Sequence, residues 1–194
     1  MTLPGIASFV SSPLDDQVKV LDTLFEHSDS LVWFTLRNKE FMSQKWGNYF
    51  EFIDAVRLRL VKLCKDTEQE GISSRGTDHL VNIIASHPRL GEPKKQLSIH
   101  SLNEQRNLGG QSDSAEVQEK LRLLNKEYEN AYEGLRFVVF VNGRTRSEII
   151  QVMQRRISSG NTWYQEACIA INEMCDIAED RAKKCSKELQ KYKM

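Results

Sequence analysis

The sequence lacks an excess of charge of either sign, because its 194 residues include 27 basic and 27 acidic side chains. Nucleic-acid-binding domains show a basic surplus or a basic stripe, and anionic membranes attract clusters of lysine and arginine. The sequence also lacks any apolar run near the roughly 18 residues that a membrane-spanning helix requires. These absences argue against a nucleic-acid partner and against a membrane partner.

Cysteine is sparse, and its spacing excludes the common cysteine motifs. The four cysteines form no C-x-x-C pair, so we expect free thiols in a reducing compartment and no metal site. The N-terminal segment has neither the basic nor the long apolar region of a secretory signal. The last residues, KYKM, match no peroxisomal tripeptide. We therefore expect a cytoplasmic protein, with a peroxisomal location as the alternative.

Glycine and proline are also scarce, at 10 and 4 residues, and they gather into no linker. Nearly every segment repeats its apolar residues with the period of an α-helix. The sequence therefore predicts an all-α fold, a single-domain bundle over residues 1–194 with about seven to nine helices. The exception is LRFVVFVNGR at residues 135–144, which is β-branched and aromatic. Since no partner strand is in sight, we expect one extended connector there.

Capping residues predict where several helices begin and end. Ser12 followed by Pro13 favours a helix start, and Thr77 is the expected N-cap of a later helix. The sequence TRSE at Thr145 matches a capping box. Gly134 is expected to end the helix before the connector in the left-handed conformation.

The longest stretch without helical periodicity runs from about residue 88 to residue 114. Long irregular connections in compact domains are more often functional than accidental. His87 and Pro88 stand at its start, and two interpretations of His87 remain open. A histidine at a helix C-terminus can interact with the helix dipole. It can also serve as a general acid or base, since histidine titrates near neutrality.

Two further residues have both a structural and a functional interpretation. Glu104 follows Ser101 in S-L-N-E, which matches a capping box, although a helix start also offers amides to an anionic ligand. Arg181 continues the apolar stripe of the last predicted helix. Either it ends the stripe and reaches solvent, or it is buried and paired, because an unpaired buried charge is costly.

Five segments occur in a characteristic order. They are FEHS (25–28), SHPRLG (86–91), SLNEQ (101–105), LNKEYENAYEGLRFVVFVNGR (124–144) and EMCDIAEDR (173–181). In this order and spacing the sequence resembles the 2-oxo-4-hydroxy-4-carboxy-5-ureidoimidazoline (OHCU) decarboxylase family, over about residues 14 to 185. The His-Pro pair together with S-x-x-E-Q is the most specific part of this resemblance.

The resemblance implies a cofactor-free, all-α, homodimeric enzyme of urate degradation, which decarboxylates a small ureidoimidazoline to (S)-allantoin. It implies that His87 and Glu104 are catalytic and that no metal takes part. The residues that it implies for substrate binding are Pro88, Ser101, Gln105, Phe137, Val138, Val139, Phe140, Val141 and Arg181. We accordingly expect the side chains of His87, Glu104 and Arg181 to converge on one pocket.

Two alternatives stay open at this stage. A hydrolase of a related ureide could use the same histidine and glutamate to activate a water, and it would release no carbon dioxide. A non-catalytic helical interaction module would instead present an exposed apolar groove, with no pocket joining the three residues.

Overall fold

The computed structural model of the chain describes residues 2–71, 74–91 and 115–191, with only the backbone described from residue 186 onward. Within these ranges the chain forms nine helices and no strand, which confirms the predicted all-α class. The helices are α1 (Ile6–Ser11), α2 (Leu14–Phe25), α3 (Asp29–Phe34), α4 (Lys39–Met42), α5 (Tyr49–Glu70), α6 (Arg75–Ala85), α8 (Ala115–Ala131), α9 (Arg146–Ile157) and α10 (Trp163–Lys191). None of the described helices is long and apolar enough to cross a membrane.

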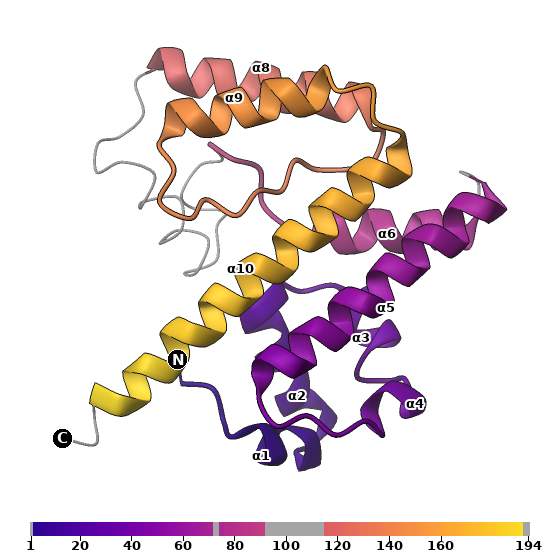
Figure 1. Cartoon of the computed structure of the whole chain (residues 1–194), viewed down its shortest axis with the longest axis vertical. Helices are drawn as coiled ribbons and strands as arrows, with labels where there is room; N and C mark the ends of the chain where they lie inside the picture. Colours follow the sequence, from indigo (N-terminus) through magenta and orange to yellow (C-terminus); the bar gives the residue numbers. More distant parts are fainter. Residues whose placement is uncertain (1, 72–73, 92–114, 192–194) are drawn as a thin grey trace.

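The long helix α10 organises the fold (Figure 1). It crosses the molecule diagonally and packs against α5, α2 and α6. Helices α8 and α9 lie side by side at one end of the molecule, and α1 to α4 gather at the other end. The segment that joins α8 to α9 runs back past α10, so it lies between the two groups of helices.

The core follows from the helical period of the apolar residues. In α5, Phe52, Val56, Leu60 and Cys64 recur every four residues, and all four are fully buried. In α10 the facing stripe contains alanines, which allow close approach of the neighbouring helix, along with larger apolar residues. Its buried members include Ala167, Ala170, Ile171, Met174, Cys175, Ile177, Ala178 and Ala182. The stripe continues at Arg181, which is buried as well.

The predicted helix ends are partly right. Thr145 and its capping box open α9 as expected, and Gly134 follows α8 with a φ of 83°. Two predicted starts are wrong. Ser74, not Thr77, caps α6, and α2 begins at Leu14 with Pro13 in the cap position. In both places several residues near the boundary are competent caps, and local sequence does not choose between them.

The predicted extended connector is confirmed, although its backbone is held by side chains and not by a partner strand. Arg156 Nη1 donates to Val138 O at 2.7 Å, and Phe140 N donates to Glu173 Oε2 at 2.6 Å. Asn142 and Gly143 then make a tight turn with φ values of 45° and 74°. This segment is thus fixed from α9 and α10, and it forms one wall of the pocket described next.

Candidate active site

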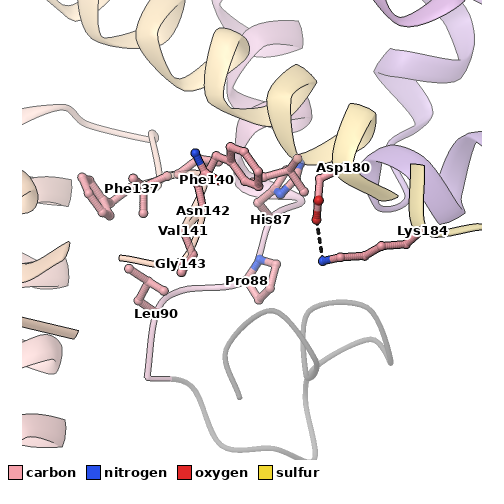
Figure 2. A pocket seen from close by; sticks show the side chains of 13 residues that line it. His87, Pro88, Leu90, Phe137, Phe140, Val141, Asn142, Gly143, Asp180 and Lys184 are labelled. Carbon is pink, nitrogen blue, oxygen red and sulfur yellow. Dashed lines mark ion pairs between the residues drawn. The ribbon is translucent and has the colours of Figure 1, made fainter. Parts of the chain in front are cut away.

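A cavity of about 190 Å³ opens where the end of α6, the extended segment and α10 meet. A volume of this size suits a small ligand. Its walls are mostly apolar, and the few polar groups come from three separate parts of the chain (Figure 2). The lining residues are His87, Pro88, Leu90, Phe137, Val138, Val139, Phe140, Val141, Asn142, Gly143, Ile177, Asp180 and Lys184.

Most of the predicted site residues that the structure describes meet in this cavity. His87, Pro88 and all five residues of 137–141 line it. Arg181 is not a lining residue, but it is buried beside His87 and affects the pKa of that imidazole. Ser101, Glu104 and Gln105 lie outside the described residues. Arg181 thus lies beside His87 without lining the cavity, and the expected convergence of His87, Glu104 and Arg181 on one pocket stays a prediction.

Asp180 and Lys184 line the cavity as well, and sequence reasoning missed them. They form an ion pair of 2.5 Å on successive turns of α10 (Figure 2). The register of α10 carried the signal, since residues three and four apart share a helix face. Ile177, Asp180, Arg181 and Lys184 follow that spacing.

His87 is buried, with only 4% of its surface exposed. Burial is the largest cause that lowers its pKa, to about 3, and the nearby Arg181 guanidinium lowers it further. The Glu26 carboxylate acts in the opposite direction. A helix dipole would have favoured the protonated ring. The burial of His87 therefore favours a neutral imidazole at pH 7, and it argues against the interpretation of His87 as a helix-dipole partner.

The surroundings of His87 also indicate which ring nitrogen carries the proton. A hydrogen bond to the Phe25 backbone raises the pKa of His87, so the backbone group must be an acceptor, which is a carbonyl. Nε2 is buried and has no hydrogen-bond partner among the described residues. The nitrogen that donates to Phe25 is then Nδ1. In the neutral ring this leaves a lone pair on Nε2, which can accept a proton or a hydrogen bond.

Arg181 is buried and paired, as one of its two interpretations required. It is 2% exposed, and Nη2 donates to Glu26 Oε1 at 2.9 Å. Nη1 donates to the carbonyls of Thr23 and Leu24, each at 3.3 Å. These acceptors all belong to the last turn of α2 or to the residue that follows it, so α2 holds the guanidinium next to His87.

A buried ionic network supports the wall of the cavity from behind. Arg156, at the end of α9, pairs with Glu166 of α10, which is fully buried. Tyr128 of α8 donates to the same carboxylate at 2.9 Å. The Arg156 guanidinium also lies 4.7 Å from the centre of the Phe137 ring, an arrangement that favours a cation–π contact. Three helices are thereby tied to the first half of the extended segment.

The backbone amides of the extended segment differ in what they can offer a ligand. The amide of Phe140 is already used by Glu173, and Arg144 donates to the Phe140 carbonyl. In the part of the chain that the structure describes, the amides of Val139 and Val141 donate to no other protein group. These two amides are therefore the candidate donors among residues 139–141. Within the same described ranges, no group of three or more His, Cys, Asp or Glu residues could hold a metal ion.

Comparisons with known proteins agree with the resemblance. The sequence profile described as OHCU decarboxylase matches residues 11–183. The chain is 29% identical over 153 residues to the uric acid degradation bifunctional protein PucL of Bacillus subtilis (strain 168), a match covering 78% of this chain and 27% of that protein. A crystal structure of (S)-allantoin synthase has a TM-score of 0.60 and 18% identity, covering 94% of this chain and 54% of the other.

The chain spans about a quarter of the length of the first relative and about half of the second. At 18% identity the structural likeness concerns the fold. The family profile, in contrast, covers most of the chain and includes His87, the extended segment and Arg181. The chain belongs to the OHCU decarboxylase family.

Proposed function

We propose that this protein decarboxylates 2-oxo-4-hydroxy-4-carboxy-5-ureidoimidazoline to (S)-allantoin without a cofactor, as a carboxy-lyase of urate degradation. The observation that carries the proposal is the state of His87. A neutral imidazole lines a small, mostly apolar cavity, and its Nε2 has no partner among the described residues. Family membership supplies the substrate class, and of the two relatives one is named for uric acid degradation and the other for the synthesis of (S)-allantoin.

The bond changes follow from the substrate. Its carboxylate and its hydroxyl sit on the same ring carbon. When the bond to the carboxylate breaks, carbon dioxide leaves and the electron pair moves toward the neighbouring ring carbon and its nitrogen. The hydroxyl then becomes the carbonyl of allantoin by losing its proton, and the carbon that bears the ureido group gains one. One further proton, taken from water, reaches the ring nitrogen, because an anionic carboxylate has become neutral carbon dioxide.

His87 has the protonation state that these transfers require. The lone pair on Nε2 can accept the hydroxyl proton, and the imidazolium that forms can deliver it to the neighbouring carbon. A low pKa makes that imidazolium a strong acid, so it returns its proton readily. Because His87 approaches from one wall of the cavity, delivery occurs on one face of the ring. A single enantiomer of the product follows.

Charge stabilisation is the second task of the site. The amides of Val139 and Val141, which donate to no group in the described ranges, are donors of fixed direction, which suits charge that develops on a carbonyl oxygen or a ring nitrogen. Arg181 contributes a positive charge behind His87 and can attract the anionic substrate. Pro88 fixes the backbone next to the histidine. We further propose that Glu104 orients His87 or the ureido group, and that Ser101 and Gln105 contact the substrate.

We also propose that the chain acts as a cytoplasmic homodimer. The family resemblance supports the dimer, and sedimentation equilibrium over a range of protein concentrations tests it. A monomer at every concentration would contradict this part of the proposal without affecting the chemistry.

The decisive experiment follows circular dichroism after the substrate has been generated fresh from urate. The spontaneous reaction gives no excess of one enantiomer, so a rising signal of (S)-allantoin measures the catalysed reaction. We expect the wild-type chain to produce that signal together with one carbon dioxide per allantoin. His87→Asn is the matched control. A wild-type protein that gives no dichroic signal above the background would refute the proposal.

The hydrolase alternative is tested in the same assay. If the neutral His87 activated a water instead, the ring compound would disappear without release of carbon dioxide. The interaction-module alternative predicts an exposed apolar groove with no pocket at His87, whereas His87 is buried and lines a cavity together with residues from α10. The mostly apolar walls favour decarboxylation over hydrolysis. The charged carboxylate of the substrate is poorly solvated by such walls, and its charge leaves the carboxyl group when that group departs as neutral carbon dioxide.

A further inference from the structure

Glu26 has a backbone conformation that is unusual for its residue type. Its φ is 64° and its ψ is 159°, at the residue that ends α2. This region is occupied almost only by glycine, because a side chain there is strained. Among the non-glycine residues that the structure describes, Asn142 alone shares a positive φ, and asparagine tolerates it. A glutamate at this position is therefore expected to make a side-chain interaction that glycine could not make.

The side chain of Glu26 shows what this contribution is. It is 14% exposed, and Oε1 accepts a hydrogen bond of 2.9 Å from Arg181 Nη2. The backbone turn at Glu26 directs the chain away from α2, while the carboxylate folds back onto a guanidinium that also binds the last carbonyls of that helix. The strained residue and the buried arginine are thus two halves of one arrangement.

This arrangement adjoins the candidate site. The residue before Glu26, Phe25, hydrogen-bonds His87 through its backbone, and the charges of Glu26 and Arg181 act on the same imidazole in opposite directions. The end of α2 therefore contacts both groups that the mechanism uses at this side of the cavity. Replacing Glu26 would remove the carboxylate that this guanidinium binds, while its contacts with the two carbonyls of α2 would remain.

We propose that Glu26 is a positioning residue, which fixes the orientation of the Arg181 guanidinium beside His87 and balances its charge so that the site can receive an anionic ureidoimidazoline. The inference rests on the proposed function. Glu26 itself need not touch the substrate. Its effect on turnover should pass through Arg181, and it should depend on negative charge more than on shape.

The variants Glu26→Gln and Glu26→Asp separate charge from shape. Glutamine keeps the length of the side chain and one acceptor oxygen but loses the charge, whereas aspartate keeps the charge and is shorter by one methylene. We expect Glu26→Gln to lower kcat/KM by roughly 10²-fold, the scale of a misplaced catalytic group, and Glu26→Asp to recover at least about tenfold of that loss. A residue that mattered only for shape would give the reverse order.

A double-mutant cycle with Arg181→Lys tests whether Glu26 acts through the arginine. In the Arg181→Lys background, Glu26→Gln should change kcat/KM by less than about threefold. Asp176→Asn is the matched control, because Asp176 lies on the same helix as Arg181, pairs with Arg57 of α5 at 3.0 Å and lies outside the cavity. We expect that variant to keep wild-type kinetics. Glu26→Gln should lower the melting temperature more than the control does, because it removes the charged partner of a buried guanidinium, so kcat/KM is compared on folded protein.

If Glu26→Gln does not fold, Glu26→Gly replaces it in the cycle, since glycine relieves the backbone strain at this position. A folded variant within about threefold of wild-type kcat/KM, an additive cycle, or a Gln variant more active than the Asp variant would each overturn the inference alone. A wild-type chain that does not decarboxylate the substrate would overturn the proposed function, and this inference with it.

Discussion

The neutral state of His87 predicts a specific dependence of stability on pH. The pKa of the histidine is about 6.5 in the unfolded chain and about 3 in the folded protein. Between these values the unfolded chain binds one more proton than the folded chain, so stability rises with pH. The stability that the folded protein gains by keeping His87 neutral is fully present above pH 6.5, and it is lost as pH falls toward 3. The loss is about 1.4 kcal/mol for each pH unit, or about 3 kcal/mol at pH 4.5.

Urea unfolding at several pH values between 7.5 and 4.5, followed by tryptophan fluorescence, measures this dependence. Other groups titrate in the same range, so the informative quantity is the difference between wild type and His87→Asn. The variant should be less stable at pH 7.5 through lost packing, and this deficit should shrink by about 3 kcal/mol toward pH 4.5. Curves that stay parallel over the whole range would refute the assignment of a buried, neutral His87.

His27 provides a control of opposite sign. A hydrogen bond to Asp22 is the main cause that raises the pKa of this exposed histidine. Its stabilising contribution is therefore present below its unfolded pKa and is lost as pH rises through the folded value. The stability deficit of His27→Asn should thus grow as the pH falls, while that of His87→Asn shrinks.

Three further predictions concern turnover and the supports of the site. The acid limb of kcat/KM should lie well below pH 6, since the free enzyme keeps His87 neutral, and an acid limb near pH 6.5 in a pH–rate profile would contradict this. Arg156→Met should lower the free energy of unfolding, measured in urea, by about 3–5 kcal/mol, because it leaves Glu166 buried without its ionic partner. Adding Glu166→Leu to that variant should restore part of the lost stability. Glu104→Gln should lower turnover by orders of magnitude while the melting temperature stays nearly constant. Ser101→Ala should cost about 0.5–2 kcal/mol of stability as a lost N-cap and should affect turnover less. A Glu104→Gln enzyme with normal kinetics would show that the S-L-N-E motif serves capping alone.

Sequence reasoning succeeded where the signal is local. The helical period of α10 pointed to Arg181 as a residue in register with a buried stripe, and the structure buries it. The composition of residues 135–144 predicted an extended segment, which the structure confirms. Both patterns depend on neighbouring residues and on backbone geometry, so they are legible without knowledge of the tertiary fold.

The properties that matter most for chemistry arise from contacts between distant residues. His87 is neutral because of burial and because of Arg181, which lies nearly a hundred residues further along the chain. The supports of the extended segment, Arg156 and Glu173, come from two later helices. Glu26 gave no signal, since nothing in its local sequence suggests a positive φ. Such features depend on which helices pack together, and the periodicity of one helix does not specify its partner.

The register of α10 has a consequence for how this chain tolerates insertions and deletions. Ile177, Asp180 and Lys184 line the cavity and Arg181 lies beside His87, and all four come from one continuous helix that also packs against α5. Each residue of an α-helix turns the chain by about 100°, so one inserted residue just before Ile177 would rotate all four side chains away from their present positions, while the earlier part of the helix kept its packing. An added residue in the exposed Ser158–Ser159–Gly160 connection before α10 would leave that register unchanged. Changes in length should therefore accumulate in such connections, and α10 should keep its length between the core and the site.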